Sequence, residues 1–127
     1  MIAFLRLIRL QNLILIAASQ YLVKYYILDI PNYINQYNLG FLLILIITLV
    51  ITASGYIIND VIDIDSDNIN KKGNIIINKH ISSHAAMLWY FILNIFGIIC
   101  TLYLFYLFKN YLLTTIFISS IFLLFYY

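Results

Sequence analysis

The sequence predicts an all-α integral membrane protein with four transmembrane helices. Hydrophobic residues make up 65% of the 127 residues, charged residues make up only 9%, and the mean hydropathy is +0.99. A soluble domain of this size cannot bury that much apolar surface, whereas helices in a bilayer expose it to lipid. Residues 1–127 are therefore expected to form a single transmembrane domain, whose apolar runs predict helices at about residues 7–28, 40–62, 84–108 and 111–127.

The first expected helix follows two arginines, Arg6 and Arg9. Small residues at positions 17–19 give this start a faint likeness to a signal peptide. The apolar run continues beyond them, so we expect an uncleaved first transmembrane helix. Pro31 and the asparagines around it then predict a short polar loop over residues 29–40 that stops the helix.

The second expected helix is apolar from Phe41 to Ile58. About 20 residues at roughly 1.5 Å each cross a hydrocarbon core of roughly 30 Å, so Asn59 and Asp60 fall where the helix leaves the membrane. The polar segment that follows, residues 59–83, contains an apolar patch at residues 75–77, which we expect on the bilayer surface.

The third and fourth helices are predicted from local signals at their ends. Ser82 or Ser83 is a natural N-cap for the third helix, because a hydroxyl oxygen can accept from a free backbone N–H of the first turn. Lys109 and Asn110 form a very short turn before the fourth helix.

The basic residues predict the orientation in the cell membrane. Five of them are expected on one side, against Lys24 and Lys109 on the other; the five are Arg6, Arg9, Lys71, Lys72 and Lys79. Cytoplasmic loops carry the excess of basic residues, so we expect the N-terminus and the loop 59–83 in the cytoplasm. The basic residues flank apolar spans and do not interleave with aromatic ones in a polar segment, which argues against nucleic-acid binding.

Four of the five acidic residues lie within eight positions of this loop, at Asp60, Asp63, Asp65 and Asp67. If the second helix continues through them, a rotation of about 100° per residue places all but Asp65 within an arc of about 60°. Three like charges on one strip repel, and the negative end of a helix adds to the repulsion, so we expect a cation there. Oxygen-only ligands favour Mg²⁺ before Ca²⁺, and Mg²⁺ typically joins carboxylates to substrate phosphates.

Three other interpretations of the polar segment are open. The aspartates could form a solvated loop that pairs with Lys71 and Lys72. The acidic spacing also imitates the start of an EF-hand, but Asn68 and Asn74 stand where that loop needs Gly and Glu. His80 and His84 share a helical spacing for metal ligands, although solvated histidines are commoner at the start of a helix. We prefer a site for a charged head group with a long lipid tail, such as an isoprenoid diphosphate.

The segment Asn59-Asp60-x-x-Asp63-x-x-x-Asp67 resembles the first aspartate-rich motif, N-D-x-x-D-x-x-x-D, of the UbiA family of intramembrane prenyltransferases. In that family the motif occupies the cytoplasmic loop after the second transmembrane helix, which is the position expected here. Residues 8–12 are similar to the I-R-P-x-N start of the family's first helix, with Leu10 in place of Pro, and residues 68–71 are similar to the D-x-I-N-K stretch after the motif.

A subfamily is indicated by two further segments. Residues 19–22, Ser-Gln-Tyr-Leu, and residues 79–82, Lys-His-Ile-Ser, resemble bacterial members, some of them described as geranylgeranylglycerol-phosphate geranylgeranyltransferases. The resemblance thus implies a bacterial inner-membrane protein.

The resemblance also implies Mg²⁺-dependent transfer of a prenyl group from an isoprenoid diphosphate to a lipid or aromatic acceptor. Asp60, Asp63 and Asp67 are the implied catalytic residues, and together with Asn59 they would hold the metal on the leaving diphosphate.

Two further residues, Asn12 and Lys71, are the implied substrate contacts, with Lys79 as an additional source of positive charge. Tyr21, Tyr25 and Tyr56 are candidates for cation–π contact with the allylic cation.

The chain departs from the family pattern in two respects. Asn74-Ile75 stands where relatives carry a basic residue, often followed by Pro. Family members also have roughly twice as many transmembrane helices and a second aspartate-rich motif. We therefore expect the first half of a UbiA-type bundle, as an N-terminal portion or a truncated product, with a second chain as the partner that would supply the rest. The alternative is a non-catalytic four-helix membrane remnant or subunit that at most binds prenyl diphosphate.

Overall fold

The computed structural model describes residues 2–27, 35–64, 76–77 and 79–126. Helices dominate the described part of the chain, so the prediction of an all-helical protein is confirmed. Five α-helices and one π-helical turn, η1, follow one another as α1 Ile2–Leu7, α2 Leu10–Leu22, η1 Val23–Ile27, α3 Asn35–Ile62, α5 Ser83–Phe108 and α6 Tyr111–Tyr126.

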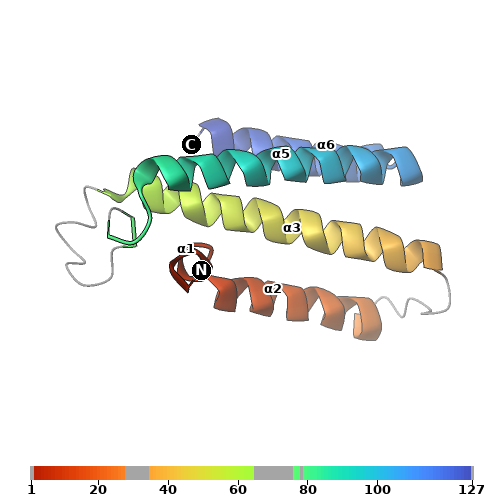
Figure 1. The fold of residues 1–127 in the computed structure, drawn as a ribbon. Helices are drawn as coiled ribbons and strands as arrows, with labels where there is room; N and C mark the ends of the chain where they lie inside the picture. Colours follow the sequence, from red (N-terminus) through yellow and green to blue (C-terminus); the bar gives the residue numbers. More distant parts are fainter. Residues whose placement is uncertain (1, 28–34, 65–75, 78, 127) are drawn as a thin grey trace.

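The four longer helices run antiparallel in chain order (Figure 1). As a result, the N-terminus, the end of α3, the start of α5 and the C-terminus share one end of the bundle. We call it the aspartate end, because Asp60 and Asp63 lie there. The start of α3 and the turn between α5 and α6 lie at the opposite end.

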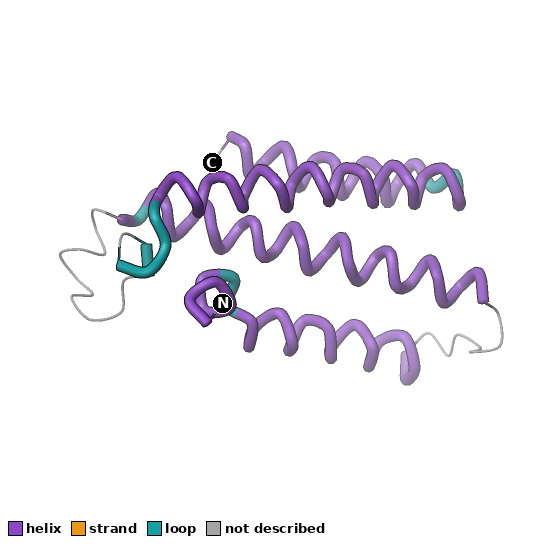
Figure 2. Tube along the Cα trace, in the orientation of Figure 1, coloured by secondary structure: helices purple, strands orange, loops and turns teal. Residues whose placement is uncertain are grey.

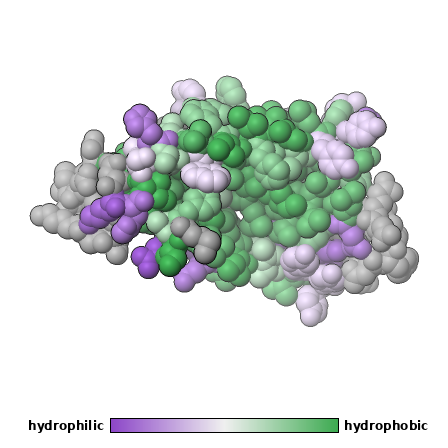
Figure 3. Space-filling view, in the orientation of Figure 1, coloured by the Kyte–Doolittle hydropathy of each residue, from purple (hydrophilic) through white to green (hydrophobic). Residues whose placement is uncertain are grey.

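Two helices, α3 from Asn38 to Ile62 and all of α5, are long and apolar enough to cross a membrane, and α6 is a shorter apolar helix. Only 33% and 28% of the residues in the most apolar stretches of α3 and α5 are buried. A core helix of a soluble protein would be mostly buried, whereas a lipid-facing helix exposes its apolar side chains. Figure 3 shows an apolar surface over the middle of the bundle with polar residues towards both ends, as in an integral membrane protein.

Two clusters of buried side chains hold α3 against its neighbours. The cluster near the aspartate end comprises Leu7, Ile57, Ile77, Ala86 and Tyr90. The cluster near the opposite end comprises Leu43, Ile47, Leu104 and Phe117. A hydrogen bond from the Tyr90 hydroxyl to the Leu124 carbonyl, 3.0 Å long, joins α5 to α6. Because Ile77 is only 2% exposed, its expected place on the bilayer surface is wrong. The helices around Ile77 enclose its side chain in an apolar environment. Ile75 lies outside the described residues.

The first expected helix, residues 7–28, is interrupted near its start. Arg9 adopts a left-handed conformation, with φ 52° and ψ 56°, which ends the regular helix after Leu7 and starts α2 at Leu10. In Figure 2, α1 is seen nearly end-on while α2 runs along the bundle. The break lets Leu7 turn into the core, where it is fully buried.

The second helix begins at Asn35, five residues earlier than expected, so the predicted loop over residues 29–40 is too long. Polar residues in the first turns of α3 led to this error. Asn, Gln and Tyr cost less than about 0.7 kcal/mol each in a helix relative to Ala, so polarity alone does not exclude them.

The ends of α5 and the start of α6 confirm the sequence prediction. The Ser82 hydroxyl accepts a hydrogen bond of 3.2 Å from the Ala85 N–H, as an N-cap does. At the other end of α5, Lys109 is left-handed with φ 51°, and the Asn110 side-chain oxygen accepts from the Leu113 N–H at 3.0 Å. The two-residue turn is thus capped on both sides.

Candidate functional site

The last turn of α3 brings Asn59 and Asp63 together. The Asp63 N–H donates to the Asn59 carbonyl at 2.9 Å, so helical bonding continues through the start of the acidic segment. The Asn59 side-chain amide donates to the Asp63 carboxylate at 3.0 Å. This contact orients the carboxylate on the strip that the sequence spacing predicts.

Asp60 forms an ion pair with a residue from the junction of α1 and α2. The Arg9 guanidinium donates to its carboxylate at 2.9 Å, and the two side chains are 42% and 21% exposed, respectively. The guanidinium carbon also lies 4.7 Å from the centre of the Tyr56 ring. Arg9 therefore joins the α1–α2 junction to α3 through one ion pair and one cation–π contact.

Asn12, which the resemblance implies as a substrate contact, lies beside Tyr56. Its side-chain amide donates to the Tyr56 hydroxyl at 3.3 Å. Tyr56 is one helical turn before Asp60, so a single tyrosine connects Asn12 and Arg9 to the acidic strip. Among the three tyrosines considered for cation–π contact, Tyr56 is the one in contact with Arg9 and Asn12.

A cavity of about 430 Å³ borders the site at the α1–α2 junction. It is lined by Ile2, Leu5, Arg6, Arg9, Leu10, Gln11 and Asn12. The lining contains two guanidinium groups and two side-chain amides, and the pairing of Arg9 with the Asp60 carboxylate gives this region charges of both signs. Such a combination suits a metal-bound phosphate ligand, since carboxylates hold the metal and guanidinium groups bind phosphate oxygens.

Asp67 and Lys71, the other two predicted site residues, lie outside the described residues. Within the described ranges, no group of three or more Asp, Glu, His or Cys side chains is arranged to hold a metal ion, and this also applies to His80 and His84. Asp60, Asp63 and the Asn59 amide still provide hard oxygen donors. They fit Mg²⁺, which proteins usually bind through one or two carboxylates together with substrate phosphates.

Arg9 is the contact that sequence reasoning did not place in the site. The positive charge of Arg9 predicts only the orientation in the membrane. Its partner Asp60 is 51 positions away in the chain, too far for a local pattern to connect them. The available signal was the likeness of residues 8–12 to the start of the family's first helix, which contains both Arg9 and Asn12.

In comparison with known protein families, residues 14–127 match the UbiA prenyltransferase family. This range is more than half of the chain and includes Asn59, Asp60 and Asp63, while Arg9 and Asn12 precede it. Neither the curated proteins nor the solved structures with which the chain was compared include a significant match.

Proposed function

Because the chain belongs to the UbiA prenyltransferase family, we propose that it acts in the Mg²⁺-dependent transfer of a prenyl group from an isoprenoid diphosphate to a lipid or aromatic acceptor in the membrane. Membership implies a transferase with prenyl diphosphate substrates. The observation that supports a site in this chain is the pairing of the acidic end of α3 with Arg9, beside a cavity and above apolar helices.

In this proposal, Asn59, Asp60 and Asp63 would hold Mg²⁺, together with Asp67 from the sequence motif. When bound, the metal supplies Lewis-acid stabilisation of the charge on the leaving group. Asn59 keeps the Asp63 carboxylate in position through its 3.0 Å hydrogen bond. Asp63 is thus oriented before the substrate arrives, which reduces the cost of binding.

Arg9 binds the diphosphate by exchanging its carboxylate partner for phosphate oxygens. The ion pair is partly exposed, so the guanidinium can reach a ligand in the adjoining cavity without leaving a buried charge behind. Asn12 holds the Tyr56 ring, whose face already contacts a cation. The same face would stabilise the allylic cation that forms when the bond between the prenyl carbon and the diphosphate oxygen breaks.

The electron pair of that bond leaves with the diphosphate. The acceptor then forms a bond to the prenyl carbon and loses a proton. Each of these steps takes place at the aspartate end, where the described polar groups of the site gather.

We infer that four segments span the membrane: α2 together with η1, then α3, α5 and α6. The aspartate end faces the cytoplasm of a bacterial cell, since basic residues are more numerous there. Arg6, Arg9 and Lys79 lie at that end, against Lys24 and Lys109 at the opposite end.

The test is prenyl transfer in membranes that contain the chain, with and without Mg²⁺, and with Asp63→Ala. We expect product from the parent only with Mg²⁺ and little or none from the variant. Equal product from parent and variant would contradict the metal assignment. No product from the parent would favour the alternative, a membrane protein that at most binds prenyl diphosphate.

A further inference from the structure

The opposite end of the bundle contains a buried lysine. Lys24 in η1 is only 4% exposed, and its ammonium donates to the Asn38 side-chain oxygen at 2.7 Å. The ammonium also lies 5.0 Å from the centre of the Tyr25 ring and 4.7 Å from that of Phe41. All three partners are neutral. Within the described part of the chain, the carboxylates belong to Asp60 and Asp63 at the other end.

Burial of this kind is unusual for a lysine at the end of a membrane helix. Such side chains normally extend along apolar surface and keep the ammonium in water. A buried ammonium is costly unless an anion lies close to it, because an amide and aromatic faces replace only part of its hydration. Among the described residues, none supplies a negative charge to the Lys24 ammonium.

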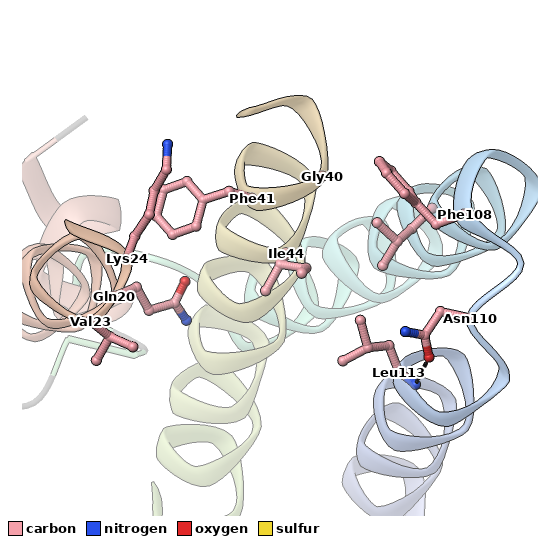
Figure 4. Close-up of a pocket in the computed structure, with 10 residues that line it drawn as sticks. Gln20, Val23, Lys24, Gly40, Phe41, Ile44, Phe108, Asn110 and Leu113 are labelled. Carbon is pink, nitrogen blue, oxygen red and sulfur yellow. Dashed lines mark hydrogen bonds between the residues drawn. The ribbon is translucent and has the colours of Figure 1, made fainter. Parts of the chain in front are cut away.

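A cavity of about 340 Å³ adjoins Lys24. Six apolar side chains supply much of its lining; these are Val23, Phe41, Ile44, Leu104, Phe108 and Leu113. Figure 4 shows the Lys24 ammonium pointing towards the start of α3, with the apolar side chains of Ile44 and Leu113 further along the bundle. The cavity thus has a positive group at its outer end and apolar walls towards the middle of the membrane.

The polar lining of this cavity is incomplete. The Gln20 side-chain oxygen is buried and has no hydrogen-bond partner among the described residues. It lies one helical turn from Lys24 on the same side of α2 and η1. Within the described part of the chain, the Gln20 oxygen thus has no donor and the Lys24 ammonium has no anionic partner.

The cavity is separate from the aspartate end. Phe41, in its wall, and Asp60 are about 28 Å apart along α3 at 1.5 Å per residue. A diphosphate at Asp60 therefore cannot also contact Lys24, and the cavity needs a ligand of its own.

We propose that this cavity binds an anionic phospholipid from the leaflet opposite the aspartate end, with its phosphate on the Lys24 ammonium and an acyl chain between Ile44 and Leu113. The phosphate supplies the negative charge that the described residues around Lys24 do not. The acyl chain occupies the apolar part of the cavity, where water would be poorly solvated. The level of the ammonium, near the end of a membrane helix, is that of lipid head groups. This inference goes beyond prenyl transfer and does not depend on it.

The test is native mass spectrometry of the purified full chain in detergent, titrated with phosphatidylglycerol or with phosphatidylcholine of the same acyl chains. We expect a preference of about fivefold for phosphatidylglycerol, the factor associated with one lysine near anionic lipid. Lys24→Gln should abolish the preference, and Lys24→Arg should retain it. Lys109→Gln is the matched control, because it removes the same charge from an exposed position at the same end.

Three results would overturn the proposal: equal binding of the two lipids by the parent, an unchanged preference in Lys24→Gln, or an equal loss in Lys109→Gln. Inorganic phosphate provides a further arm, since it carries the charge without the acyl chain. Displacement of the lipid by inorganic phosphate at a similar concentration would also overturn the lipid assignment, because the apolar walls would then contribute nothing. Circular dichroism of each variant identifies loss of folding, and Lys24→Arg keeps the test decisive if Lys24→Gln does not fold.

Discussion

The two ends of the bundle place a cation near α3 in opposite ways. At the aspartate end, the Arg9 side chain is 42% exposed and lies 2.9 Å from a carboxylate. At the opposite end, Lys24 is 4% exposed and donates to a neutral amide. An exposed ion pair can exchange partners at little cost, whereas an ammonium buried among neutral groups, as Lys24 is among the described residues, is costly unless an anion lies close to it. In the two proposals above, the aspartate end accordingly exchanges a substrate, whereas the opposite end holds a lipid.

The largest expected effect concerns the carboxylate of the exposed pair. Asp60→Asn removes a proposed metal ligand and the charge that holds Arg9, so we expect prenyl transfer to fall by about 100-fold or more. Asp65→Asn is the control, because Asp65 falls outside the three-then-four spacing of the motif. Similar activity in the two variants would break the comparison, since the ion pair would then have no part in the reaction.

The next effect concerns the cation of the same pair. Arg9→Gln should raise KM for the prenyl diphosphate by about tenfold, because a charge-assisted hydrogen bond contributes roughly 1.5–3 kcal/mol. Steady-state kinetics at saturating Mg²⁺ measures the change. Arg6 lines the same cavity but lacks the contact with Asp60, so Arg6→Gln should raise KM less than Arg9→Gln does. Equal effects would point to general positive charge and not to the contact of Arg9.

A smaller effect tests whether local capping stabilises the aspartate end. Ser82→Ala removes the N-cap of α5 and should reduce the free energy of unfolding by about 1 kcal/mol. Unfolding in detergent, followed by circular dichroism, measures it. Ser83→Ala, one position further on, should change the free energy of unfolding much less. If both variants lose the same stability, the cap is not what fixes the start of α5.

The smallest expected effect concerns Phe108, which lines the cavity at the opposite end. A Cβ added at Gly40 would lie 2.9 Å from the tip of the Phe108 ring, so Gly40→Ala must shift the ring that lines the cavity. We expect phosphatidylglycerol binding to weaken by about twofold, with the fold intact. At Gly97 the nearest atom is 3.5 Å away, so Gly97→Ala should leave lipid binding unchanged. Identical binding by the two variants would remove Phe108 from the proposed site.

The helices were predictable where hydropathy or a capping side chain fixes an end. Ser82 and Asn110 have side chains that satisfy backbone N–H groups, so the start of α5 and the turn before α6 follow from residue type. The break at Arg9 did not follow, because no propensity favours a left-handed arginine. Tertiary contacts with Asp60 and Tyr56 accompany it.

In the candidate site, too, local features could be predicted from the sequence and long-range contacts could not. The spacing predicted that Asp60, Asp63 and Asp67 share one strip; the helix continues as far as Asp63, whose N–H bonds to the Asn59 carbonyl, and Asp67 lies outside the described residues. The partner of Asp60 comes from a distant helix, and hydrophobic periodicity carries no information about such pairs. Lys24 could be assigned from sequence only as a basic residue near a helix end. Its burial depends on how η1 packs against α3.

The central claim is that the aspartate end binds prenyl diphosphate through a metal held by carboxylates. The most direct measurement is binding of an unreactive prenyl thiodiphosphate to the purified chain, with and without Mg²⁺, for the parent and for Asp63→Ala. We predict Mg²⁺-dependent binding by the parent that weakens by at least about tenfold in the variant. Binding of equal strength in both proteins, or binding by the parent that ignores Mg²⁺, would contradict the claim.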